Sequence, residues 1–264
     1  MNFPSIDPVF LRLGPLEFRW YGLMYILGFI AAFFIIRNQA RKQHLEITTD
    51  MASDLVFTIA MGVVLGGRLG YILFYDLSWY VAHPLKILAV WEGGMSFHGG
   101  LLGALTAAVY IFRKFRLDFW QMADILAQAG PVGLGLGRLG NFINGELYGR
   151  TTDLPWGVVF PGGGPVPRHP SQLYEAFLEG VVLFFAVRVI SGLKAPAGTA
   201  FWTFISGYGL FRFFVEFFRE PDRHIGFLWG GATMGQLLSL PMFVLGVVMI
   251  VVGYGRKKGG PDRL

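Results

Sequence analysis

Long apolar runs alternate with short polar segments along the whole chain. Seven of these runs are close to the roughly 20 residues that an α-helix needs to cross the hydrocarbon of a bilayer. They occupy residues 20–36, 51–75, 94–112, 119–139, 171–190, 198–218 and 236–254. The first run is short for a span unless Leu16 and Phe18 extend it. The pattern predicts an all-α integral membrane protein, with seven transmembrane helices in one polytopic domain over residues 1–264 and residues 141–170 outside the bilayer.

The composition agrees with a membrane protein. Hydrophobic residues make up 54% of the chain and charged residues 15%, whereas a soluble domain has about 25% charged residues. The net charge of +5 does not indicate nucleic-acid binding, because Lys and Arg lie in short clusters between the apolar runs. The chain has no cysteine, which excludes a disulfide or a cysteine nucleophile of its own. No histidine or carboxylate cluster has metal-ligand spacing, so we expect no metal and no cofactor.

The basic clusters predict the orientation of the helices. Twelve Lys and Arg residues follow the odd-numbered spans, seven lie on the other side, and three lie within spans. Cytoplasmic loops carry an excess of Lys and Arg. The N-terminus is therefore expected outside and the C-terminus in the cytoplasm.

Three arginines lie inside the predicted spans, near the outer ends of the second, fourth and sixth: Arg68, Arg138 and Arg212. An arginine at the centre of a transmembrane helix costs roughly 3 kcal/mol on insertion scales, so each needs a structural or functional reason. Because the predicted orientation puts all three at a similar depth, they could converge on a phosphate group.

The fourth span runs into GRLGNFINGELYG, residues 137–149. If the helix continues, Arg138, Asn141 and Asn144 share one face, since residues three apart are neighbours on a helix. A cation and two amides on one face would hold an anion at the membrane surface. The letters GLGRLG at 135–140 also match the dinucleotide fingerprint, but that fingerprint requires a preceding strand. Close helix packing explains these glycines better, as it does for Gly62, Gly66 and Gly70.

Residues 93–100, GGMSFHGG, open the third span at its outer end. The imidazole of His98 could take a proton from a nucleophile, or it could be a helix-entry histidine satisfied by the backbone. The spacing leaves both interpretations open. Ser96 suggests a serine hydrolase, but the chain has no G-x-S-x-G motif around it.

Two more polar stretches mark the outer ends of spans. Tyr208, Arg212 and Glu216 are four apart and line one face of the sixth span. The arginine and glutamate could form an internal pair, or the pair could also hold the guanidinium toward a ligand. His169 begins RHPSQLYE, residues 168–175, whose polar groups either cap the fifth span or line an outer vestibule.

These motifs closely resemble the phosphatidylglycerol–prolipoprotein diacylglyceryl transferase family of bacteria. Besides GRLGNFINGELYG and GGMSFHGG, the blocks FRWYGLMY, RHPSQLYE and GYGLFRFFVEFFRE match it in order, from about Phe18 to Met249. The resemblance implies a seven-span enzyme of the bacterial inner membrane with its active site facing the periplasm. It implies transfer of diacylglyceryl from phosphatidylglycerol to the lipobox cysteine of a prolipoprotein, with a thioether formed and glycerol phosphate released. The partners implied are that lipid, prolipoprotein signal peptides and the surrounding membrane lipids. The connection from Arg150 to Arg168 looks short for the family.

The resemblance also implies roles for individual residues. The family's essential positions fall on Tyr21, His98, Arg138, Asn141, Glu146, Gly149, Tyr208, Arg212 and Glu216. In that chemistry, Arg138 and Arg212 would hold the phosphate and His98 would be the general base for the thiol. Tyr21, Asn141 and Asn144 would orient the head group, and Glu146 and Glu216 would position the arginines. Arg68 and His169 complete the set of candidate substrate-binding residues.

A transporter or flippase for an anionic lipid or solute is the main alternative, because membrane arginines also mark substrate paths. Three features oppose it: the odd number of spans, the lack of paired broken helices in two halves, and polar groups confined to the outer side. A purely structural anchor would leave the arginines in the spans unexplained.

Overall fold

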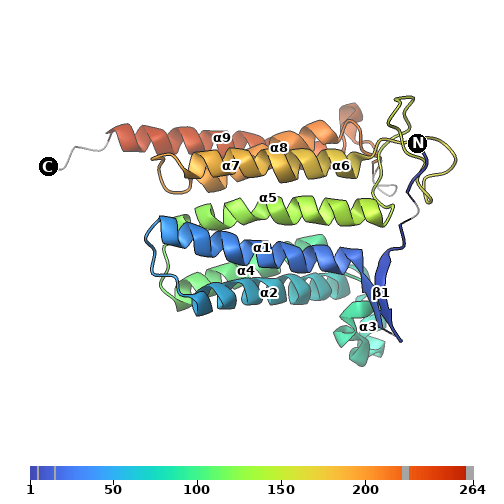
Figure 1. Cartoon of the computed structure of the whole chain (residues 1–264), viewed down its shortest axis with the longest axis horizontal. Coiled ribbons are helices and arrows are strands. Elements are labelled where there is room, and N and C mark those ends of the chain that lie inside the picture. The colour runs from blue at the N-terminus through green and yellow to red at the C-terminus, as the bar shows by residue number, and fades with distance from the viewer. Residues whose placement is uncertain (5, 15, 222–225, 260–264) are drawn as a thin grey trace. The chain divides into compact units, whose positions relative to one another are not determined.

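The computed structural model describes residues 1–4, 6–14, 16–221 and 226–259 (Figure 1). The chain divides into two compact units. The larger unit comprises Met1–Ile35 and Ala123–Leu264, and the smaller unit is Ile36–Met122. Of the basic residues that predict the orientation, Arg223 and Arg263 lie outside the described residues, as do the side chains of residues 256–258.

Each of the seven predicted spans coincides with helix. Six of them correspond to α1 (Trp20–Lys42), α2 (Thr49–Tyr75), α4 (Phe97–Lys114), α5 (Phe119–Ile143), α8 (Thr199–Val215) and α9 (Met234–Gly259). The fifth is built from α6 (Ser171–Glu175), a π-helical stretch (Ala176–Val182) and α7 (Leu183–Ser191). Helices long and apolar enough to cross a membrane are found over Trp20–Lys42, Thr49–Tyr75 and Met234–Gly255. The protein is thus a mainly helical membrane protein, while the number of spans and their orientation stay predictions.

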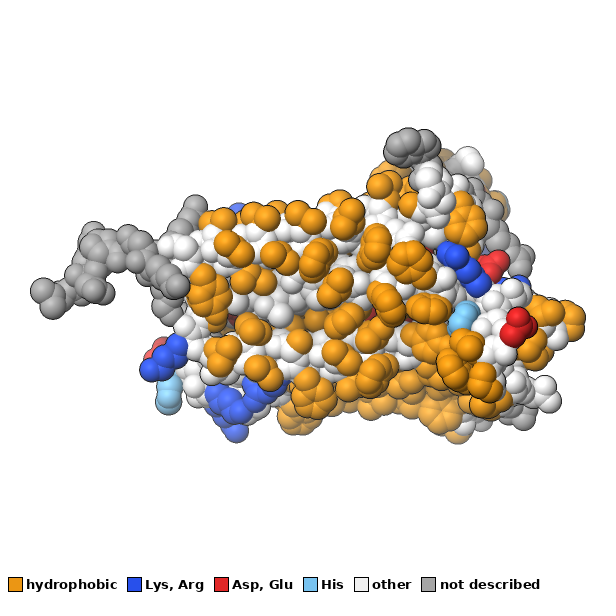
Figure 2. Space-filling model, turned by 90° about the horizontal axis from the view of Figure 1, so that it is seen from above, with side chains coloured by type: hydrophobic (Ala, Val, Ile, Leu, Met, Phe, Trp, Pro, Cys, Tyr) orange, Lys and Arg blue, Asp and Glu red, His pale blue; other side chains and the backbone are white. Residues whose placement is uncertain are grey.

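The surface agrees with a lipid environment. Large apolar side chains on the helices are strongly exposed, including Phe34 at 64%, Phe57 at 66% and Val251 at 64%. On the face shown in Figure 2, hydrophobic side chains cover the helical surfaces and the Lys and Arg side chains gather near helix ends. Such a surface is favourable in hydrocarbon and unfavourable in water, where large exposed apolar patches are rare.

The expectation of an all-α chain is wrong at the N-terminus. Strands β1 (Val9–Leu13) and β2 (Leu16–Arg19) form an antiparallel hairpin before α1. Leu16 and Phe18 therefore belong to a strand and do not extend the first helix. The alternation of apolar and charged residues in LEFR, residues 16–19, is a period of two and indicates a strand. Short helical segments, α3 (Leu77–Ala82), a 3-10 turn at Pro84–Leu88 and another at Val90–Glu92, also lie outside the predicted spans.

Glycines bring α2 and α4 together in the smaller unit. A Cβ at Gly62 would lie 2.5 Å from the carbonyl oxygen of Gly103, and one at Gly70 would lie 2.8 Å from the Cα of Gly99. Gly66 also faces the backbone of Gly99 and Gly103. This is the close backbone approach that small residues at four-residue spacing permit between membrane helices. The packing interpretation of Gly62, Gly66 and Gly70 is confirmed.

Buried and half-buried polar groups also occur at the end of the larger unit where α8 begins. The carboxylate of Asp124 accepts hydrogen bonds from the backbone N–H groups of Gly198 and Phe201, both at 2.8 Å. Arg188 donates to Gln128 at 3.2 Å. In the predicted orientation this end faces the cytoplasm, so polar groups are not confined to the outer side. Here they have structural partners, since Asp124 satisfies N–H groups at the first turn of α8 that lack intrahelical acceptors.

Candidate active site

Two of the three predicted arginines meet on one carboxylate in the larger unit. Glu175 at the end of α6 is fully buried. Its Oε2 lies 3.2 Å from Nε of Arg138 on α5, and its Oε1 forms an ion pair with Nη1 of Arg212 on α8. Arg219, beyond the end of α8, reaches the same Oε1 at 3.7 Å. The fold thus gathers three guanidinium groups from separate segments around Glu175.

A second glutamate lies beside this cluster on the π-helical stretch. Glu179 is fully buried, and its Oε2 is 3.9 Å from Nε of Arg138. The stretch packs tightly on α5, because a Cβ at Gly180 would lie only 2.8 Å from the Cα of Gly135. This close approach brings two buried carboxylates beside Arg138. Single-turn π-helical segments inside α-helices are frequent at functional sites.

A chain of polar contacts fixes Arg212 from its other side. Its Nη2 lies 2.5 Å from Oε1 of Glu216, one helical turn later. The other oxygen of Glu216 accepts a hydrogen bond from the hydroxyl of Thr233 at 2.7 Å. Thr233 in turn exchanges backbone and side-chain hydrogen bonds with Gln236 on α9. The internal pair of Arg212 with Glu216 that the sequence suggested is present, and Glu216 holds this arginine in place.

Arg138 keeps unused hydrogen-bond donors. Its closest contacts with Glu175 and Glu179 are both through Nε, and its side chain is 16% exposed. Within the described part of the chain, Nη1 and Nη2 of Arg138 make no hydrogen bond. The guanidinium is therefore anchored along one edge, while the two terminal nitrogens that can grip a phosphate in bidentate fashion stay available.

The end of α5 differs from the expected continuous helical face. Arg138 and Asn141 lie on α5, but the helix ends at Ile143 and Asn144 lies in the turn after it. Glu146 accepts hydrogen bonds from the side-chain amides of Asn141 at 2.9 Å and Asn144 at 3.2 Å. Glu146 thus orients the two amides, and no contact with an arginine is seen among the described residues. Gly145 makes this turn possible with a φ of 66°, a left-handed conformation that glycine adopts readily.

Tyr21 and Tyr208 line this region from two other helices. A Cβ at Gly140 would lie 2.9 Å from Cδ2 of Tyr21, so the ring of Tyr21 lies directly against α5. The hydroxyl of Tyr21 is 3.2 Å from that of Tyr25. Tyr208 lies two turns of α8 before Glu216 and stacks on Phe204. Tyr21 therefore stays close to the residues of GRLGNFINGELYG, as its candidate role requires.

The segment between α5 and α6 is tied back to the end of α8. The backbone of Gly149 pairs with Arg219, and its N–H donates to the carbonyl of His169 at 2.8 Å. A Cβ at Gly149 would lie 2.7 Å from the Cβ of His169, which leaves no space for a side chain. Arg150 donates to the carbonyls of Glu216 and Arg219. Gly149 therefore has a clear packing role beside the arginine cluster.

His169 contributes an aromatic contact. Its ring lies edge-on to Phe218, and its Nδ1 is 3.2 Å from the hydroxyl of Tyr174. Burial lowers the pKa of His169 below its usual range, because desolvation penalises the charged imidazolium. We therefore expect a neutral imidazole at neutral pH.

In the smaller unit, the guanidinium of Arg68 donates all its hydrogen bonds to neighbouring backbone. It is 3% exposed and makes five hydrogen bonds of 2.5 to 3.3 Å to backbone carbonyls of Lys86, Ile87, Ala89, Gly93 and Gly94. Its guanidinium also lies 5.0 Å from the ring centre of Tyr80. Because a guanidinium has five N–H donors, these contacts leave none for a phosphate. These contacts hold the segment between α2 and α4, and they do not support the substrate-binding role of Arg68, which stays a prediction.

His98 is the second residue of α4 in the smaller unit. Ser96 caps this helix, since its hydroxyl accepts from the N–H of Gly99 at 3.3 Å. The side chain of His98 is exposed, and its ring lies edge-on to Phe97 at 5.7 Å. Among the described residues no hydrogen bond uses the imidazole nitrogens. The capping role therefore falls to Ser96, and the role of His98 stays a prediction.

Sequence reasoning missed Glu175, Glu179 and Arg219 as members of the cluster. The signal was present, because Glu175 and Glu179 are two carboxylates four residues apart in an apolar run. Charges inside membrane segments are expected to pair with one another. Three predicted arginines with no assigned partners should have drawn attention to these glutamates.

The chain matches the family described as prolipoprotein diacylglyceryl transferase over residues 8–252. It is 66% identical over 261 residues to the phosphatidylglycerol–prolipoprotein diacylglyceryl transferase of Geobacter sulfurreducens, which covers 99% of this chain and 100% of that protein. Proteins of the same name from Vibrio cholerae and Photobacterium profundum are 51% and 50% identical, over 97% and 96% of this chain and 94% and 96% of those proteins. The predicted resemblance is confirmed: the chain belongs to the prolipoprotein diacylglyceryl transferase family and is a transferase.

Proposed function

We propose that the protein transfers the diacylglyceryl group of phosphatidylglycerol to the lipobox cysteine of a prolipoprotein. The names of the relatives supply the two substrates. In the reaction, the cysteine sulfur attacks the glyceryl carbon that carries the phosphate ester, and the C–S bond forms as the C–O bond breaks. The thiol gives its proton to a base, and glycerol phosphate leaves as an anion. The free cysteine thiol belongs to the substrate, since this chain has none.

The observation that carries this proposal is the arrangement of Arg138 beside Arg212. Negative charge develops on the phosphate oxygen as the C–O bond breaks, and donors placed in advance around that charge supply the largest single contribution to many enzymatic rates. Arg138 is held through Nε, so its Nη1 and Nη2 can contact the phosphate without losing the anchor on Glu175. Arg212 is fixed between Glu175 and Glu216 and adds positive charge at the same place.

The side-chain amides and the tyrosine hydroxyl at the end of α5 would recognise the lipid head group. Glu146 holds the side-chain amides of Asn141 and Asn144 in fixed orientations, which leaves their oxygens for hydroxyl groups of the glycerol. Tyr21 lies against the same end of α5. His98 is our candidate for the general base, because its imidazole is exposed and is not used to cap its helix. Positioning of a ligand is the alternative role for His98.

We further propose seven membrane spans in the bacterial inner membrane, with the N-terminus and the active site on the periplasmic side. The helices at each predicted span and the division of basic residues support this arrangement. Reporter fusions after Tyr148 should be active in the periplasm, and fusions after residue 256 should be active in the cytoplasm. The opposite result at either position contradicts the orientation.

Mass spectrometry of a lipobox peptide tests the proposed reaction. The purified protein is incubated with the peptide and phosphatidylglycerol, and we expect the cysteine to gain one diacylglyceryl group as glycerol phosphate is released. Zwitterionic phosphatidylethanolamine should give no product. Equal rates with both lipids would remove head-group recognition. Movement of labelled lipid across vesicle membranes with an unmodified peptide would favour a transporter instead.

A further inference from the structure

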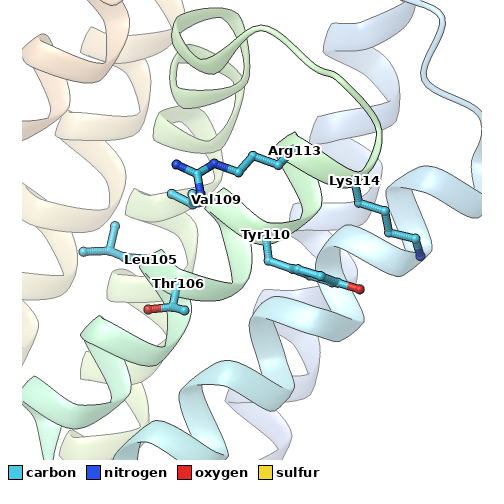
Figure 3. A pocket seen from close by; sticks show the side chains of 6 residues that line it. All are labelled: Leu105, Thr106, Val109, Tyr110, Arg113 and Lys114. Atoms are coloured by element: carbon cyan, nitrogen blue, oxygen red, sulfur yellow. The ribbon is translucent and has the colours of Figure 1, made fainter.

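The surface of α4 carries a groove far along the helix from His98. The groove has a volume of about 660 Å³ and follows a stripe of α4 over Leu105, Thr106, Val109, Tyr110, Arg113 and Lys114. In Figure 3, Arg113 leaves the helix on one side, and Tyr110 and Lys114 leave it on the other. Apolar side chains thus form one end of the groove, and two cations form the other.

A second groove shares its cationic end with the first. It has a volume of about 560 Å³ and is lined by Val109, Phe112, Arg113, Arg116, Leu117 and Phe119. Arg113 and Val109 therefore belong to both grooves. The combined surface offers apolar walls on either side of one guanidinium, with Arg116 next to it.

The cations of this surface differ in whether they have a partner. Lys114 forms an ion pair with Asp54 at 3.0 Å and also lies over the ring of Phe115. Arg113 and Arg116 are exposed, and neither has an ion-pair or hydrogen-bond partner through its side chain within the described part of the chain. No carboxylate lines either groove. An anionic ligand would complement the charge of such a surface.

We propose that this surface binds an anionic phospholipid, with its phosphate at Arg113 and Arg116 and an acyl chain along Val109 and Leu105. A basic pocket at the end of a membrane helix is suited to anionic lipid head groups. The exposed Leu105 and the half-buried Val109 extend the site from the helix end toward the middle of the helix, where a free phosphate would find nothing to bind. None of these residues takes part in the reaction proposed above.

A photoreactive lipid tests the site on the full-length protein. The protein is placed in nanodiscs of zwitterionic phosphatidylcholine with phosphatidylglycerol that carries a diazirine on one acyl chain. After illumination, peptide mass spectrometry locates the labelled residues, which separates this surface from the proposed active site. We expect label on residues 105–110, which is competed by unlabelled phosphatidylglycerol and is unaffected by additional phosphatidylcholine or inorganic phosphate.

Two matched variants decide whether the surface itself binds the lipid. Arg113→Gln with Arg116→Gln should lower the labelling of residues 105–110 at least tenfold, while transferase activity shows that the protein is folded. Arg41→Gln with Lys42→Gln removes two exposed charges elsewhere in the same unit and should leave the labelling within twofold. Equal losses in both variants would show attraction by net charge alone and overturn the proposal. Absence of label on residues 105–110, or competition by phosphatidylcholine, would overturn it as well.

Discussion

Arg68 and Arg138 lie on long apolar helices, yet the protein uses them in opposite ways. Arg68 is 3% exposed and gives all its donors to backbone carbonyls. The closest contacts of Arg138 with its carboxylate partners are through Nε, and its two terminal nitrogens make no hydrogen bond in the described structure. The same residue type at a similar position in a helix can therefore support the fold or be available for chemistry. The groups that accept hydrogen bonds from the arginine distinguish the two roles better than the position of the arginine along its helix does.

His98 also has an imidazole that makes no hydrogen bond to the described residues, and here we expect the largest effect. With His98→Gln, the transfer rate should fall by about 10²–10⁴ if general base catalysis is lost. A higher pH supplies thiolate without the base, so the variant should recover part of its rate as the pH approaches a thiol pKa near 8.5. Initial rates against pH, with lipid binding followed separately, measure this. Poor lipid binding with no recovery at high pH would make His98 a positioning residue.

Arg138→Lys should lower the transfer rate about 10²–10³-fold, the effect typical of removing one preorganised donor from a site of developing charge. Lysine keeps the positive charge but cannot make planar bidentate contacts with a phosphate. The thermal unfolding temperature should change little, because Glu175 and Glu179 can still pair with the ammonium group. Rates and unfolding are measured on the same preparation. Near-normal turnover would show that Arg138 only neutralises the buried glutamates.

Arg68→Lys should show the reverse pattern. Lysine has three donors where Arg68 uses five, and hydrogen bonds to charged groups contribute about 1.5–3 kcal/mol each. We expect a loss of roughly 3 kcal/mol or more in unfolding free energy, seen as a lower unfolding temperature, with activity per folded molecule within about threefold of the wild type. An inactive variant of unchanged stability would restore Arg68 to the substrate site.

Much of the helical architecture could be predicted because it follows from single-sequence patterns. The apolar runs located every long helix, since their length and continuity are set by the chain itself. Helix ends were less accurate: α1 runs to Lys42 instead of residue 36, and α4 starts at Phe97 after the Ser96 cap. Caps and basic last turns extend or end helices locally, and hydropathy does not record them. The hairpin at Val9–Arg19 was missed because it is far too short to register as a span.

The site was harder to predict because it depends on pairing between distant segments. The motifs named Arg138, Arg212 and Glu216, and the last two do pair. They did not show that Glu175 would join Arg138 to Arg212, because α5, α6 and α8 meet only in the folded chain. The same limit explains Arg68. Its carbonyl partners lie 18 to 26 residues away, in a 3-10 turn and the loops after it, where no sequence pattern predicts a hydrogen bond to Arg68.

The smallest effect is expected from Gly235→Ala, which tests whether fixing Arg212 matters. Gly235 at the start of α9 lies so close to Glu216 that a Cβ would be 2.5 Å from its Oε1 and 2.8 Å from its Cγ. The added methyl group should displace the carboxylate that holds Arg212 and lower the rate about tenfold, since misplacing a catalytic group by about 1 Å can cost up to 10²-fold. Rates at saturating lipid measure this effect. Gly253→Ala on the same helix meets only Pro196, at 3.9 Å, and should be neutral.

A double variant separates this cause from a general disturbance of α9. If Gly235→Ala acts through Glu216, it should cost almost nothing further in a Glu216→Ala background, because residues that share one interaction are not additive. Full additivity of the two losses would mean that the methyl group disturbs the packing of α9 on α8 instead. A rate within twofold of the wild type for Gly235→Ala would show that Arg212 tolerates movement. Arg212 would then act mainly as a positive charge whose exact position matters little. Its N–H donors would contribute less to the transfer rate than those of Arg138.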